Sequence, residues 1–263
     1  MISSLEQFNA AIRDIRKDSA EATEILFRGQ VDSSWMVKST LERIGIPKIP
    51  CSEYYLFIDK IKPLINPFIE SKYQRKATTA GYPINFGEYD KTSWSLPELE
   101  YLTYLRHHGF PTPIIDWTKS PYVALFFSCE DFATSRTDGK VFVYSKSNAA
   151  SVEGSSIPTL QTIGEYVETD KRHVAQQSKY LVPIIYLKEW QFITFGTVSL
   201  AKQAFYTVKE LEIESDAKAG IIRELTVMNI NRFTMYLSED SLIRNYADVF
   251  ALEYMDKLKG RNC

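Results

Sequence analysis

The fifteen residues from His107 to Pro121 constrain the fold of this chain more than any other segment, because they end one helix and begin another. Gly109 follows a leucine-rich helical pattern over residues 97–108, and glycine readily adopts the left-handed conformation that ends a helix. Ser120 and Pro121 then begin a second helix over residues 122–129, since a hydroxyl caps a helix and proline suits its first turn. This second helix is apolar nearly all round, so it must be buried.

The same segment carries polar side chains where a ligand could bind. His107 and His108 fall in the last turn of the first helix, where they meet its free carbonyl groups. The run Asp116-Trp117-Thr118 comes just before the second helix, and we expect it to lie at that helix N-terminus. Free amides at a helix N-terminus favour phosphate or carboxylate. The segment therefore predicts an anion site.

Hydrophobic spacing elsewhere predicts a mixture of helices and strands. The predicted helices cover residues 5–15, capped by Ser3 or Ser4, residues 53–73, interrupted by Pro63 and Pro67, residues 215–228, capped by Ser215, and residues 240–255, capped by Asp240. The predicted strands cover residues 24–29, 140–145, 181–187 and 190–195. Together these elements indicate the α+β class.

The length and composition favour one domain over residues 1–263. The chain is 44% hydrophobic, and no stretch is rich enough in Gly, Pro or Ser to separate two domains. Residues 76–95 are polar and rich in glycine and tyrosine, so they are a candidate lid over a pocket. A surface insert explains them equally well.

Charge and cysteine content exclude several classes of protein. The formal net charge of −2 argues against strong non-specific binding of nucleic acid or of an anionic membrane surface. The N-terminal sequence lacks the layout of a signal peptide, and no apolar run approaches the roughly 20 residues of a membrane span, so we expect a cytoplasmic protein. Three dispersed cysteines and three histidines indicate reduced thiols and no metal site.

Two polar residues outside the central segment are also candidates for the site. Arg28 ends the first predicted strand, and Gln176 lies just before the strand over residues 181–187, where its side chain could point into a cleft. Packing offers another explanation, in which Arg28 and Asp116 form a buried ion pair and Trp117 fills the core. Gln176 would then be a loop amide whose hydrogen bonds are satisfied within the protein.

Phe27-Arg28-Gly29 and the block over residues 106–127 resemble the FRG-domain family, which is named for the Phe-Arg-Gly motif. A third element, Arg172 with Ala175 and Gln176, also follows the family pattern, as do Leu225, Met228 and Ile230. The resemblance implies an FRG-domain core over about residues 24–246. The chain departs from the pattern at Arg106, where glutamine is usual, and at Pro113, where arginine is usual.

The order of these motifs is in turn similar to that of ADP-ribosyltransferases, which implies a fold of helices packed around a central split, mostly antiparallel sheet. It also implies NAD as the substrate, no metal, and Arg28, Thr118 and Gln176 as the catalytic residues. Arg28 would hold the pyrophosphate, and Gln176 would stand where a catalytic glutamate is usual, although a neutral amide cannot stabilise an oxocarbenium-like transition state by charge. Nucleotide binding would further involve Gly29, where the dinucleotide approaches the backbone, with Gln30, His107, His108, Asp116, Trp117 and Ser120.

The resemblance implies bacterial defence or toxicity as the context, with a protein or nucleic acid as acceptor and a regulatory or antitoxin partner. Two alternatives remain open at this point. One is a nucleotide-binding or nucleic-acid-binding module without turnover, which a ligand would saturate without product release. The other is an effector that acts through a protein partner, which should expose an apolar patch.

Overall fold

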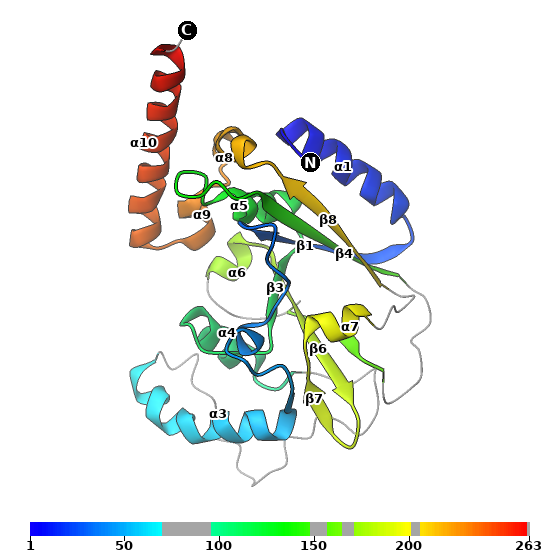
Figure 1. Cartoon of the computed structure of the whole chain (residues 1–263). Coiled ribbons are helices and arrows are strands. Elements are labelled where there is room, and N and C mark those ends of the chain that lie inside the picture. Colours follow the sequence, from blue (N-terminus) through cyan, green and yellow to red (C-terminus); the bar gives the residue numbers. More distant parts are fainter. Residues whose placement is uncertain (70–95, 148–156, 165–170, 201–205, 262–263) are drawn as a thin grey trace.

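The computed structural model describes residues 1–69, 96–147, 157–164, 171–200 and 206–261 (Figure 1). The predicted lid over residues 76–95 lies outside the described residues. The α-helices are α1 (Leu5–Asp18), α2 (Thr40–Arg43), α3 (Cys51–Ile65), α4 (Leu99–His107), α5 (Pro121–Cys129), α6 (Lys171–Ala175), α7 (Phe195–Leu200), α8 (Lys218–Val227), α9 (Arg232–Tyr236) and α10 (Glu239–Arg261), with short 3₁₀ turns η1 (Asn66–Phe68) and η3 (Ser215–Ala217). The strands are β1 (Ala22–Gln30), β2 (Ile49–Pro50), β3 (Ile115–Thr118), β4 (Gly139–Ser147), β5 (Thr159–Ile163), β6 (Ser178–Tyr186), β7 (Trp190–Phe192) and β8 (Tyr206–Ile213). This mixture confirms the α+β class.

The strands form one antiparallel sheet in the order β2-β7-β6-β3-β1-β4-β8, with β5 paired to β6. The pairing is long on either side of the centre, where β1 pairs with β4 over most of its length and β3 pairs with β6 throughout. Between β1 and β3, however, the only backbone pair is Phe27 with Thr118. The two halves of the sheet are therefore joined at one point, and their strands diverge beyond it.

The buried apolar residues form three clusters, and successive side chains of a strand point to opposite faces of the sheet. Phe27 faces a cluster shared with α1, α5, α8 and α10, whereas Leu26 faces the opposite cluster, which α7 covers. The third cluster lies where α3 and α4 pack against β6 and β7, and it includes Val182. The central strands thus separate apolar layers on their two faces, which explains why the sheet is buried on both faces at its centre.

Helix α5 packs unusually close to the sheet. It crosses β1 and β4 where each strand has a glycine, and a Cβ atom on Gly29 would lie 2.8 Å from the backbone nitrogen of Ser128. A Cβ atom on Gly139 would likewise overlap the backbone of Ser128. The helix is apolar on nearly every side, as the sequence predicts, and only Tyr122 and Phe127 of its residues are partly exposed.

Several predicted boundaries are confirmed at the central segment. Helix α4 ends at His107, with His108 as its C-cap, and Gly109 has a φ of 85°. Helix α5 begins at Pro121 after Ser120, whose hydroxyl accepts a hydrogen bond from the backbone N–H of Val123 at 3.3 Å. The end of α4 and the start of α5 are therefore both set by residues next to them in the sequence.

Other predicted helix boundaries are wrong. Ser215 begins a 3₁₀ turn and does not cap α8, which has no side-chain cap. Asp240 lies in the first turn of α10, whereas Ser238 accepts a hydrogen bond from the backbone N–H of Ser241 and occupies the capping position. At α10 a neighbouring serine therefore takes the capping role, whereas at α8 the 3₁₀ turn leads directly into the helix.

Candidate functional site

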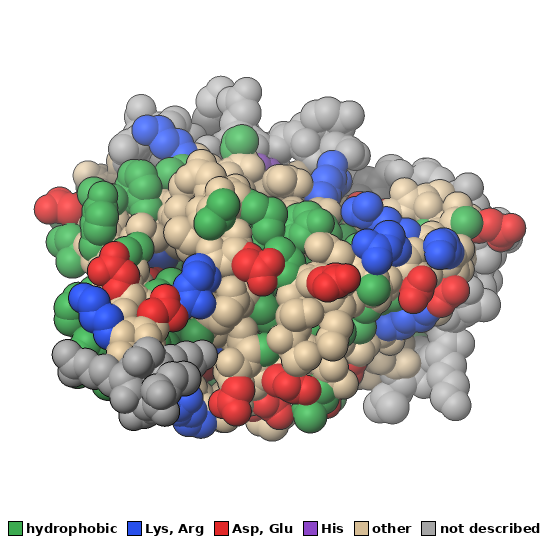
Figure 2. Space-filling view, turned by 90° about the horizontal axis from the view of Figure 1, so that it is seen from above, with side chains coloured by type: hydrophobic (Ala, Val, Ile, Leu, Met, Phe, Trp, Pro, Cys, Tyr) green, Lys and Arg blue, Asp and Glu red, His purple; other side chains and the backbone are tan. Residues whose placement is uncertain are grey.

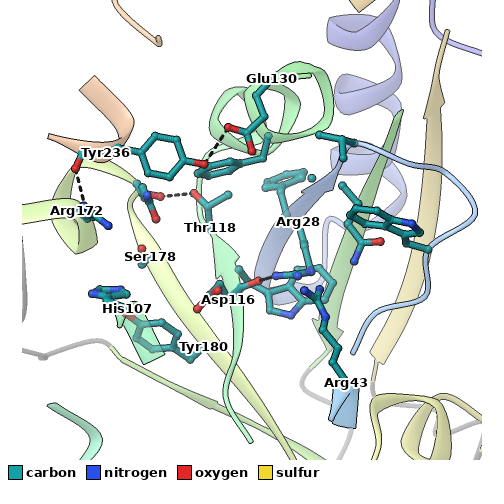
Figure 3. A pocket seen from close by; sticks show the side chains of 18 residues that line it. Arg28, Arg43, His107, Asp116, Thr118, Glu130, Arg172, Ser178, Tyr180 and Tyr236 are labelled. Atoms are coloured by element: carbon teal, nitrogen blue, oxygen red, sulfur yellow. Dashed lines mark hydrogen bonds between the residues drawn. The ribbon is translucent and has the colours of Figure 1, made fainter. Parts of the chain in front are cut away.

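The pocket opens where β1 and β3 diverge, beside the single backbone pair of Phe27 and Thr118 (Figure 3). Its volume is about 330 Å³, near the lower end of the range for small-molecule sites. The lining residues come from both halves of the sheet, from five helices and from the loops between them, and they are Phe27, Arg28, Gly29, Gln30, Val31, Trp35, Arg43, His107, Asp116, Trp117, Thr118, Phe127, Glu130, Arg172, Gln176, Ser178, Tyr180 and Tyr236. The tertiary structure thus brings Arg28, Thr118 and Gln176 together, as the sequence predicts.

Arg28 spans the gap between the two strands. Its Nη1 donates a hydrogen bond to the backbone carbonyl of Asp116 at 2.6 Å, at a position where no backbone pair joins β1 to β3. Burial lowers the pKa of Arg28 to about 10, with further lowering from the neighbouring charges of Arg106 and Arg43 and an opposing contribution from Asp116. The guanidinium therefore stays protonated at neutral pH in a site that holds several positive charges.

The predicted ion pair between Arg28 and Asp116 is wrong, because the carboxylate of Asp116 pairs with Arg106. Both carboxylate oxygens accept hydrogen bonds from Arg106, through Nε at 2.7 Å and through Nη2. Burial raises the pKa of Asp116, but Arg106 outweighs burial, and with Arg28 and His107 it holds that pKa below the ordinary value. Arg106, one of the two departures from the family pattern, thus supplies the partner of this carboxylate.

Thr118 and Gln176 lie side by side, but the side chains of both already make hydrogen bonds within the protein. The hydroxyl of Thr118 donates to the backbone carbonyl of Gln176 at 2.6 Å and accepts from the backbone N–H of Ser120 at 3.0 Å. The side-chain amide of Gln176 donates to the carbonyl of Met235 at 2.9 Å. These bonds connect β3, the turn before β6 and α9 into one wall of the pocket.

Most of the residues assigned to the predicted anion site do not lie at the N-terminus of α5. Asp116, Trp117 and Thr118 form strand β3, so they do not belong to the helix end. Ser120 alone of the predicted group caps α5. The strand forms because Asp116 to Thr118 pair with residues 178–180 of β6, a contact between distant parts of the chain.

The two histidines differ in position. His107 lines the pocket, as Figure 3 shows, whereas His108 is exposed and its ring packs against Tyr104 at a centroid distance of 4.5 Å, away from the pocket. Trp117 is only 2% exposed and packs on Tyr144, so it is largely a core residue with one edge at the pocket.

Strands β1 and β3 bring to the pocket buried polar atoms that have no hydrogen-bond partner among the described residues. They are Nε of Arg28, the indole nitrogen of Trp117, and both the oxygen and nitrogen of the Gln30 amide. A buried polar atom without a partner costs about 1–3 kcal/mol. Gly29, between Arg28 and Gln30, has a clear structural role here, because only a glycine lets α5 approach the strand.

A carboxylate that the sequence did not indicate, Glu130, lies at the opposite wall. Its Oε2 accepts hydrogen bonds from the hydroxyl of Tyr236 at 2.9 Å and from Nη1 of Arg232 at 3.3 Å, while Oε1 has no hydrogen-bond partner among the described residues. Burial raises the pKa of Glu130 despite these two donors. Glu130 can therefore accept a proton from a ligand in the pocket.

Arg43, Trp35 and Tyr236 also line the pocket without having been predicted. Glu130 follows directly on the predicted helix over residues 122–129, and this position could have indicated it. The other three come from segments far from the central motif, and nothing in their local sequence points to a site. Arg172 was noted as part of the family pattern, and its Nε donates to the carbonyl of Tyr236 at 2.7 Å.

The pocket is positively charged overall. Its two carboxylates, Asp116 and Glu130, are each bonded by an arginine from outside the lining. Neither Arg28 nor Arg43 has a carboxylate partner within the described part of the chain. Across the described ranges, no group of three or more His, Cys, Asp and Glu side chains could hold a metal ion. The arrangement therefore suits an anionic ligand.

On the face that Figure 2 shows, no such charge excess is visible. Figure 2 shows a face on which acidic and basic side chains are interspersed among hydrophobic ones. No helix among the described residues is long and apolar enough to cross a membrane.

Comparison with known proteins adds one match. No curated protein and no solved structure matches the chain. Residues 23–137 match the family model described as FRG domain, and this span holds both Phe27-Arg28-Gly29 and the segment from His107 to Pro121. The chain therefore carries an FRG domain, the family that its motifs resemble.

Proposed function

We propose that the pocket binds an anionic nucleotide, and that NAD is the nucleotide it cleaves, either by transfer of ADP-ribose to an acceptor or by hydrolysis. The observation that carries this proposal is the presence of Arg28 and Arg43 at one cavity without a bonded carboxylate, since the nearby carboxylate of Asp116 is taken by Arg106. A planar guanidinium binds phosphate oxygens through paired, charge-assisted hydrogen bonds. The pyrophosphate of NAD is such a group.

The size and composition of the pocket suit the pyrophosphate of a dinucleotide together with those parts of its two halves that lie next to it. A volume of about 330 Å³ is close to the lower limit of about 300 Å³ for ligand sites. Trp35 and Phe127 supply aromatic surface, on which a base or nicotinamide ring can stack. Part of NAD would extend beyond the pocket, where an acceptor could reach it.

Cleavage would break the bond between the ribose C1′ and the nicotinamide nitrogen, and the electron pair would leave with nicotinamide. Positive charge then develops on the ribose, and a carboxylate stabilises it far better than a neutral amide. Glu130 is the pocket carboxylate with an oxygen that no described residue bonds, so we assign it this role in place of Gln176. It would then accept the proton that the attacking hydroxyl or water loses.

The first experiment measures nicotinamide release from NAD by mass spectrometry, with and without cell extract as a source of acceptor. We expect release by the wild-type protein and none above background by Arg28→Ala. Arg16→Ala is the matched control, because Arg16 is an exposed arginine on α1, far from the pocket lining. Equal release by Arg28→Ala and the wild type would remove Arg28 from the site.

Glu130→Gln separates catalysis from binding. This change keeps the shape of the side chain and removes its charge, so NAD affinity by calorimetry should stay within a few-fold while release falls by about 100-fold or more. Loss of affinity and activity together would show that Glu130 supports the structure of the pocket.

A second function is nucleotide binding without turnover. It is favoured because two of the three predicted catalytic residues already make hydrogen bonds within the protein. The Thr118 hydroxyl and the Gln176 amide both make hydrogen bonds within the protein. A binding module would be saturated by NAD without releasing nicotinamide, and Arg28→Ala would abolish that saturation. The same two assays therefore distinguish the two functions.

Helix α10 favours a third function, docking to a protein partner such as a regulatory or antitoxin protein. It extends beyond the other elements in Figure 1, and one stripe of its surface is apolar and exposed. The stripe consists of Ile243, Tyr246, Phe250, Tyr254 and Leu258, with exposures from 44% to 70%. A partner on this helix could act together with a nucleotide in the pocket.

A further inference from the structure

Gln30 is a polar side chain whose hydrogen bonds the protein leaves unmade. It ends β1, two residues after Arg28 and on the same face of the strand, and it lines the pocket. The residue is only 4% exposed, yet neither the oxygen nor the nitrogen of its amide has a partner among the described residues. Buried amides are normally hydrogen-bonded, so this wall of the pocket lacks a donor and an acceptor.

The group that satisfies Gln30 must offer a donor and an acceptor side by side. The amide oxygen accepts one hydrogen bond, and the amide N–H groups donate others in the same plane. The edge of adenine has this pattern, with its exocyclic amino group next to a ring nitrogen, and glutamine pairs with it through two bonds. Gln30 is therefore matched to a nucleobase edge.

An aromatic surface lies at the same end of the pocket. Trp35 follows β1 by five residues, in a turn fixed by hydrogen bonds from Ser33 N–H to the carbonyl of Asp138 and from Trp35 N–H to the carbonyl of Asp32. Trp35 is 50% exposed and lines the pocket, and its indole packs on no other ring within the described ranges. A purine can stack on such a surface.

The backbone register sets the order of the groups along the pocket. Thr118 pairs with Phe27, three residues before Gln30, which is a distance of about 10 Å along a strand. Arg28 lies between these two positions. A dinucleotide whose pyrophosphate is at Arg28 would therefore place one end beside Thr118 and the other beside Gln30.

We propose that Gln30 and Trp35 form an adenine subsite, with Gln30 pairing with the base edge and Trp35 stacking on the ring. This inference rests on the proposed function, because it assumes that the pocket binds a nucleotide. It assigns the adenine half of NAD to the Gln30 end of the pocket and the nicotinamide ribose to the end that Thr118 and Glu130 line.

The test compares two ligands that differ by one amino group, ADP and purine riboside 5′-diphosphate, in calorimetric titrations of the full chain. The wild-type protein should bind ADP at least about tenfold more tightly, because the analogue leaves the Gln30 oxygen without a donor. Gln30→Leu, which has a similar shape and no hydrogen-bonding atoms, should bind both ligands with equal affinity. Trp35→Ala should weaken both ligands, and Trp35→Phe should restore most of the affinity.

Each contrary outcome has a distinct meaning. Equal affinity of the wild-type protein for the two ligands would overturn the adenine subsite and leave nucleotide binding intact, whether or not Gln30→Leu folds. A preference for ADP that persists in Gln30→Leu would overturn the role of Gln30. Binding of neither diphosphate would overturn both the inference and the proposed function, whereas an ADP preference without nicotinamide release would support the subsite and reject NAD cleavage.

Discussion

Replacing Gly29 by alanine should destabilise the fold strongly, because the backbone of α5 occupies the place of the added methyl group. The new Cβ atom would overlap the carbonyl oxygen of Ala124 and lie 2.8 Å from the backbone nitrogen of Ser128. Ordinary contacts begin at 3.4 Å, so the Ser128 contact alone requires a shift of about 0.6 Å, and the closer overlap with the Ala124 oxygen requires the helix to move further. These neighbours are backbone atoms of a buried helix, and a change of rotamer cannot relieve the overlap.

The magnitude follows from the cost of overfilling a packed core. Extra methylene groups cost about 1–3 kcal/mol where side chains can adjust, and occasionally more. Because α5 is enclosed by the cluster around Phe27, we expect the upper end, about 3 kcal/mol, for Gly29→Ala. In a chain of this size that corresponds to a fall in melting temperature of about 6–12 °C.

Urea unfolding followed by far-UV circular dichroism measures this loss directly. Gly220→Ala is the matched control, because Gly220 lies within α8 and an added Cβ atom meets nothing within 4 Å. This control should be at least as stable as the wild type, since alanine forms helix more readily than glycine and the added methyl group meets no neighbour. If Gly29→Ala were as stable as the wild type, the close approach of α5 would not be the reason for glycine in the Phe-Arg-Gly motif.

Three further predictions concern single contacts. The pKa of Asp116 lies below its ordinary value, so the stability that its charge provides is complete above the ordinary carboxyl pKa of about 3.9 and is lost as the pH falls through the lower pKa of the folded state. Asp116→Asn should therefore reduce the fall of the urea midpoint on the acid side. A fall with the same slope as in the wild type would contradict this prediction. Ser120→Ala should cost about 1 kcal/mol in the same assay through loss of the cap on α5, whereas Ser120→Asp should retain most of it. On α10, Leu252→Ala should lower the free energy of unfolding by about 2–5 kcal/mol, because Leu252 is only 7% exposed. Phe250 is 70% exposed, so Phe250→Ala should change the melting temperature by no more than about 2 °C.

The sequence by itself determined the features that depend on neighbouring residues. Gly109 ends α4, Ser120 and Pro121 begin α5, and the apolar run of α5 requires burial, because capping and helix periodicity act within one or two turns. The Phe27-Arg28-Gly29 motif likewise indicated both the buried strand and an arginine at a pocket. The predicted caps failed at Asp240, where Ser238 caps α10 instead, and at Ser215, where a 3₁₀ turn leads into α8 without a side-chain cap.

The tertiary structure alone decided which polar groups bond to each other. Asp116 pairs with Arg106 and not with Arg28, Gln176 donates to a carbonyl of α9, and Glu130, at the end of α5, accepts a hydrogen bond from Tyr236. These partners are brought together by the register of β1, β3 and β6, which is set by packing across the whole sheet. Burial then decides which of these groups is left for a ligand, because a polar atom inside the protein must find its partner in the fold or in the molecule that the fold binds.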